Sequence, residues 1–115
     1  YGAWVLFVSH LPMQRWFSKR GIPAVLAGAG FPGIVLPSVE FDHRGISLHA
    51  AQRMRALGHI RAVFLALRTQ SAADERSEKG FIEGFASGGR GTPEPPQIVY
   101  HEPGADAVRR KLEPI

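Results

Sequence analysis

The sequence contains no cysteine, and this absence removes several kinds of chemistry at once. Without thiols, the chain can form no disulfide, use no cysteine nucleophile and hold no cysteine-ligated zinc. It also lacks the run of about 20 apolar residues that a membrane-spanning helix needs. Its first residues have neither the basic start nor the small-residue cleavage site of a signal peptide. We therefore expect a cytoplasmic protein that does not enter a membrane.

The composition is that of an ordinary globular domain. The 115 residues are 44% hydrophobic and 21% charged, which is enough for one domain with a real core. The net charge is +4, but the basic residues gather near expected helix ends, where cations complement the helix dipole. The aromatic residues fall at apolar positions typical of a core: Trp4, Trp16, Phe64, Phe81 and Phe85. The chain therefore lacks the exposed stacking surface expected of a direct nucleic-acid binder.

Strand-like and helix-like segments alternate along the whole chain. Short apolar segments rich in β-formers predict strands at residues 3–8, 22–27, 38–42, 61–67 and 97–100. Between them, helical patterns cover residues 12–20, 44–57, the segment from Ser71 to Gly88, and 106–112. In the second of these, the apolar residues recur at helical spacing: Ile46, Ala50, Met54 and Leu57. Ser71 and Asp74 resemble a helix cap. This alternation predicts an α/β fold with a mostly parallel sheet and flanking helices.

One glycine-rich segment matches the dinucleotide-binding pattern. Gly28, Gly30 and Gly33 follow a predicted strand with the required spacing. The pattern works only if a helix begins within it and directs its N-terminus at the pyrophosphate. Pro32 and Pro37 interrupt the following stretch, and no acidic residue lies near position 50 to hold the ribose. A Rossmann-like oxidoreductase domain therefore stays an alternative that dinucleotide binding would test.

Patterns for metal binding and catalysis do not appear. No two of the five histidines have the four-residue spacing that places two imidazoles on one helical face. The chain also lacks a nucleophile elbow and a phosphate-loop lysine. We expect no metal, no cofactor and no enzymatic activity.

Polar residues follow the predicted strands at the edge where open α/β sheets bind ligands. Ser9 and His10 follow the first strand, and a polar run from Asp74 to Glu78 opens a helix after another strand. That run is either a solvated, charged first turn or part of a ligand site. Both interpretations stay open at this point.

The order of several short motifs resembles the LacI-type repressor family. They are Gly21-Ile22-Pro23-Ala24-Val25, the segment 36–42, a helix ending Leu57-Gly58-His59, the strand 61–65, and Glu78-Lys79-Gly80-Phe81 followed by Phe85. The resemblance runs from about Trp4 to Phe85 and continues weakly over residues 97–112.

This resemblance implies part of a two-lobed fold like that of type I periplasmic sugar-binding proteins. Residues 1–41 would belong to the N-terminal lobe and residues 42–115 to the C-terminal lobe. A small effector, such as a sugar or a related metabolite, would bind between them and modulate operator DNA binding. The DNA-binding helix-turn-helix head of the family is missing from this chain, and the full-length regulator is expected to be a homodimer. A solute-binding protein of a transporter with the same fold is the alternative.

The effector site implied by the resemblance combines hydrogen-bonding side chains with one stacking ring. The predicted effector-binding residues are Ser9, His10, Phe31, Asp74, Arg76 and Ser77. Two positions depart from the family: Ser77 stands where members often carry arginine, and Gly28 where many sugar-responsive members carry an acid. A polyol held by a carboxylate and an arginine is therefore not predicted, and the identity of the effector stays open.

Overall fold

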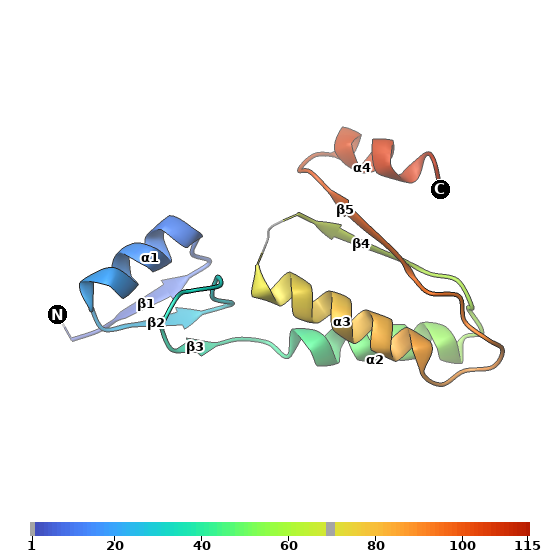
Figure 1. The fold of residues 1–115 in the computed structure, drawn as a ribbon, viewed down its shortest axis with the longest axis horizontal. Helices are drawn as coiled ribbons and strands as arrows, with labels where there is room; N and C mark the ends of the chain where they lie inside the picture. Colours follow the sequence, from blue (N-terminus) through green and yellow to red (C-terminus); the bar gives the residue numbers. More distant parts are fainter. Residues whose placement is uncertain (1, 69–70) are drawn as a thin grey trace.

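The computed structural model describes residues 2–68 and 71–115. Its elements are β1 Trp4–Phe7, α1 Leu11–Arg20, β2 Ala24–Ala27, β3 Ser38–Val39, α2 His43–Ala56, β4 Val63–Leu67, α3 Ala72–Ala86, β5 Gln97–His101 and α4 Ala105–Leu112 (Figure 1). The strands form two sheets, β1-β2-β3 and β4-β5, and every pair is parallel. The predicted α/β fold with parallel strands and flanking helices is therefore confirmed.

Local signals set the helix ends. Gly21 closes α1 in the left-handed conformation at φ 64°, which costs glycine no steric strain. The Asp42 carboxylate caps α2 by accepting a hydrogen bond from the Gly45 amide at 2.9 Å. The Ser71 hydroxyl accepts from the Asp74 amide at 3.3 Å and caps α3. The cap predicted at Ser71 is therefore present.

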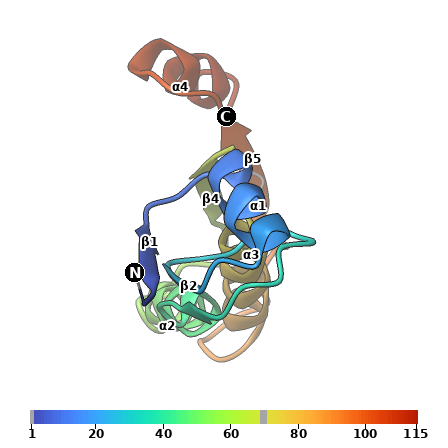
Figure 2. The same ribbon diagram turned by 90° about the vertical axis from the view of Figure 1, so that its left-hand side faces the viewer.

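The molecule is elongated and has two separate cores. Its radius of gyration is 17.5 Å, against about 13 Å for a compact domain of this length. Helix α1 covers one face of β1-β2-β3, whereas α2 and α3 lie on one side of β4-β5 and α4 on the other (Figure 1, Figure 2). The first core contains Leu6, Ala24 and Leu26, and the second contains Ala51, Phe81 and Phe85.

One face of the first sheet is bare within the described residues. Leu6 and Leu26 point to the α1 side and are buried, whereas Val5, Phe7 and Val39 are exposed. Parallel sheets in α/β proteins are usually covered on both faces. The bare face is therefore an apolar surface that the described residues do not cover.

The prediction that Trp4 and Trp16 belong to the core is wrong. Each is 47% exposed. Trp16 packs edge-on against Phe17, and the Arg20 guanidinium lies 4.6 Å above its ring. The short helix α1 buries only a narrow face against the sheet, so these large rings lie at its margin. Phe64, Phe81 and Phe85 do pack in the second core, as predicted.

The apolar positions predicted for α2 only partly match the face that packs, since Met54 alone of them packs against the second core. Ile46 and Leu57 are exposed, whereas the buried residues are Ala51 and Arg55. This face packs against two glycines of α3, Gly80 and Gly84. The backbones of the two helices touch there, because a Cβ added at Gly84 would lie 2.4 Å from the Leu48 carbonyl oxygen, and one at Gly80 2.1 Å from that of Arg44.

Candidate functional site

A pocket lies where the carboxyl ends of the first sheet meet the starts of α2 and α3. Its volume is about 410 Å³. In open α/β sheets, this edge is where ligands bind. Most of its lining is apolar, and the polar exceptions are Glu40 and His43. The lining residues are Phe7, Ala27, Gly28, Ala29, Val39, Glu40, Phe41, His43 and Ala73.

Glu40 is the charged centre of this pocket. Its side chain is 18% exposed, and Oε1 lies 2.6 Å from the Arg76 guanidinium on α3. Oε2 is buried without a hydrogen-bond partner, and the Nε2 atom of His43 lies 3.8 Å away. The Glu40–Arg76 pair therefore ties the segment after β3 to the first turns of α3.

A buried amide organises the two loops beside the pocket. Gln14 is 1% exposed. Its Nε2 donates to the Ser9 hydroxyl at 3.0 Å and lies 3.3 Å from the Ala29 carbonyl oxygen. Its Oε1 accepts from the Phe31 amide at 3.1 Å. Gln14 thus joins the loop after β1 to the loop after β2.

Replacing Gln14 with leucine is expected to lower the free energy of unfolding by about 1–3 kcal/mol, because several buried polar groups lose their partner together. The matched control is Gln52→Leu, since Gln52 is exposed on α2, and changes of less than about 0.5 kcal/mol are expected there. Urea denaturation measures the free energy of unfolding of both variants, provided that the dependence on urea concentration (the m-value) is the same for both. Equal midpoints for the two variants would contradict the linking role of Gln14.

The structure brings some of the predicted effector-binding residues together and separates others. Ser9 and Phe31 meet through Gln14, and Arg76 lies beside Glu40. His10 is exposed and only precedes α1, with no side-chain cap bond. Asp74 and Ser77 lie in the first turns of α3 and are partly buried.

Sequence reasoning missed Gln14, Glu40 and His43. The available signal for His43 was its position between the predicted strand 38–42 and the predicted helix 44–57, and Glu40 lies within that strand near its carboxyl end. Gln14 had no such signal, because nothing in its spacing marks a buried amide.

A second polar contact joins α3 to β5. The Tyr100 hydroxyl donates to Glu78 Oε2 at 2.6 Å. Burial raises the pKa of Tyr100 to about 12, and the hydrogen bond to Glu78 and the negative charges of Glu78 and Asp74 act in the same direction. The Arg68 guanidinium lies 5.6 Å from the ring centre and acts in the opposite direction. Tyr100 therefore stays protonated at neutral pH and serves as a donor.

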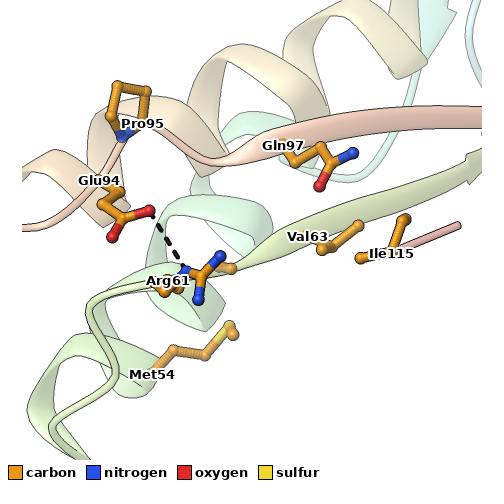
Figure 3. Close-up of a pocket in the computed structure, with 8 residues that line it drawn as sticks. Met54, Arg61, Val63, Glu94, Pro95, Gln97 and Ile115 are labelled. Carbon is orange, nitrogen blue, oxygen red and sulfur yellow. Dashed lines mark ion pairs between the residues drawn. The ribbon is translucent and has the colours of Figure 1, made fainter.

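A larger pocket, of about 580 Å³, lies at the amino ends of β4 and β5 (Figure 3). The Arg61–Glu94 ion pair at 3.3 Å crosses it, with Met54, Val63 and Ile115 nearby. Both charged groups are exposed, and such pairs contribute little energy. The strands present their amino ends here, which is the edge that ligands of open α/β sheets do not use. We therefore take the pocket at Glu40 as the candidate site.

Other kinds of site find no support in the described part of the chain. No group of three or more histidine, aspartate or glutamate side chains among residues 2–68 and 71–115 is placed to hold a metal ion. Within the same residues, no helix is long and apolar enough to cross a membrane. The segment 28–37 contains no helix either, so the glycine pattern there lacks the helix N-terminus that a dinucleotide would need.

The fold is similar to that of two solved transcription regulators, so the resemblance predicted from the sequence is confirmed at the level of the fold. The chain is similar to a probable maltose operon transcriptional repressor, MalR, from Staphylococcus aureus, with a TM-score of 0.76 and 15% identity, over 98% of this chain and 40% of that one. It is also similar to the Cra transcriptional dual regulator from Pseudomonas putida in complex with fructose 1-phosphate, with a TM-score of 0.69 and 16% identity, over 96% of this chain and 42% of that one.

These similarities cover only part of each neighbour. The chain spans about two fifths of the length of both regulators. No protein-family model matches the sequence, and no curated protein matches it. The likeness to the two regulators is therefore one of fold.

Proposed function

We propose that this chain is part of the effector-sensing domain of a bacterial transcription regulator. One lobe would comprise residues 1–41 and the other residues 42–115. The observation that carries the proposal is the pocket at Glu40, whose lining comes from both parts: Phe7 and Val39 from the first, His43 and Ala73 from the second. A small molecule bound there would contact both lobes at once.

Binding would act by shifting the equilibrium between two arrangements of the lobes. A ligand changes such an equilibrium only by its difference in affinity for the two states. A molecule that touches both sides of this pocket favours the arrangement that closes on it, as the Glu40–Arg76 pair already does. Of the six predicted residues, Ser9, His10, Phe31, Asp74, Arg76 and Ser77, the proposal keeps Arg76, which pairs with Glu40 of the pocket lining.

We also propose that the full-length regulator is a cytoplasmic homodimer that binds operator DNA through a helix-turn-helix head outside this chain. The fold neighbours support a regulator, and the structure of Cra contains a small sugar phosphate. The proposal does not include catalysis or a cofactor.

The test uses the protein expressed from its complete natural gene. A thermal-shift screen against metabolites should find a ligand that raises the melting temperature, since saturation at 100 times Kd adds about 2.7 kcal/mol to stability. In a mobility-shift assay, the same ligand should change how tightly the protein binds promoter DNA from beside its own gene. A stabilising ligand without any DNA binding would indicate a solute-binding protein instead. Stabilisation by nicotinamide dinucleotides alone would instead indicate a Rossmann-like oxidoreductase domain.

A further inference from the structure

Glu40 Oε1 pairs with Arg76, whereas Oε2 accepts no hydrogen bond and has His43 Nε2 at 3.8 Å. Arg76 already compensates the negative charge at Oε1. Oε2 is buried and accepts no hydrogen bond, although buried acceptors are normally satisfied. The Glu40 side chain is 18% exposed in the pocket, so a ligand there can donate a hydrogen bond to the carboxylate, whose charge Arg76 already compensates.

The walls around Glu40 favour a flat apolar molecule. Phe7 and Phe41 are 77% and 79% exposed, so their rings are open to be covered by a ligand. Val39 adds an aliphatic surface. Gly28 leaves room, because a Cβ built there would meet no atom within 4 Å. Rings that stack on these phenyl groups would gain both burial and aromatic contact.

The same pocket does not suit a phosphate. Among the described residues, those that line it include no lysine or arginine. The nearby Arg76 is engaged with Glu40. A phosphate placed beside Glu40 would be repelled by the carboxylate and would lack the cationic donors on which phosphate recognition depends.

We propose, on the basis of the function proposed above, that this pocket takes a neutral, flat, mostly apolar ring compound. The compound would donate one N–H or O–H hydrogen bond to the Glu40 carboxylate and stack against Phe7 and Phe41. Aromatic alcohols and nitrogen heterocycles of indole size have this chemistry, and sugar phosphates do not.

Three probes test the proposal on the protein expressed from its complete natural gene. Indole carries one N–H donor, 1-methylindole has nearly the same shape without it, and fructose 1-phosphate is the anionic alternative. Isothermal titration should show indole binding at least about tenfold tighter than 1-methylindole, the ratio expected for a hydrogen bond to a carboxylate. Fructose 1-phosphate should not bind at millimolar concentration.

A variant separates the role of Glu40 from general apolar binding. Glu40→Met removes the acceptor at similar length, so the two indoles should bind equally. It also releases Arg76, so fructose 1-phosphate binding should appear. Glu75→Gln is the control, because Glu75 pairs with Lys79 on the exposed side of α3 and should leave the indole preference intact.

The outcomes separate this inference from the proposed function. Tighter binding of fructose 1-phosphate to the unmodified protein would overturn the inference and leave effector sensing standing. Equal binding of the two indoles, or no indole binding at millimolar concentration, would also overturn it. If no compound in the wider metabolite screen bound either, the proposed function would fail as well.

Discussion

Replacing Arg55 with methionine is expected to lower the free energy of unfolding by about 1.5–3 kcal/mol or more, the contribution of hydrogen bonds that involve a charged group. Its guanidinium donates to the carbonyl oxygens of His59 at 2.8 Å, Gly88 at 3.1 Å, Arg90 at 3.2 Å and Gly91 at 2.8 Å. Methionine fills a similar space but leaves these acceptors without their donor.

The site of Arg55 explains how a cation tolerates burial. The residue is 1% exposed, and the groups that hold it are carbonyl oxygens and the Phe85 ring, whose centre lies 5.6 Å from the guanidinium carbon. It lies in the last turn of α2, and its partners Gly88 and Gly91 follow α3. Helix C-termini carry partial negative charge, which stabilises a cation placed there. Arg55 therefore holds the two helix ends together.

Two variants make this prediction specific. Arg53→Met removes a cation from the same turn, but Arg53 is exposed, so a change of less than about 0.5 kcal/mol is expected. Arg55→Lys keeps the charge but loses the planar guanidinium with its several donors. Its loss of stability should therefore lie between those of Arg53→Met and Arg55→Met. Urea denaturation followed by circular dichroism measures all three. An Arg55→Met variant as stable as Arg53→Met would refute the role given to Arg55.

Replacing Gly84 with alanine is expected to destabilise the protein by about 1–3 kcal/mol, the range for inserting extra atoms into a tightly packed core. In an open helix, the same change would stabilise by about 0.5–1 kcal/mol. The sign reverses here because the new methyl group would lie 2.4 Å from the Leu48 carbonyl oxygen, which forces α2 and α3 apart.

The control for Gly84 is Glu75→Ala, an exposed position on α3 where only the ion pair with Lys79 is lost. That variant should change stability by a few tenths of a kcal/mol. Thermal melts compare the melting temperatures of the unmodified protein, Gly84→Ala and Glu75→Ala. A melting temperature for Gly84→Ala above that of the unmodified protein would show that the two helices do not touch as described.

The sequence predicted the element order because its local signals are strong and agree with one another. Strand and helix patterns alternate throughout, Gly21 stops the first helix, and Ser71 caps α3. The packing face of α2 was predicted only at Met54, because periodic apolar residues such as Ile46 and Leu57 do not reveal which surface has a partner. The actual contact rests on Gly80 and Gly84, whose lack of a side chain has no apolar signature.

The rule that ligands bind at the carboxyl ends of parallel strands pointed to the sheet edge where the pocket at Glu40 lies. None of the six residues predicted from the sequence lines that pocket. Gln14 and Glu40 are buried polar residues, and their burial depends on loops that meet only in three dimensions. No spacing along the chain distinguishes them from solvated side chains.

The central claim is that a small molecule binds between the first sheet and the starts of α2 and α3. Methyl-labelled protein titrated with a ligand from the screen tests it most directly by NMR. We expect shifts at the methyl groups of Ala27, Val39 and Ala73, which line the pocket at Glu40. Shifts confined to Ala62, Val63 and Ile115, which line the opposite pocket, would contradict it.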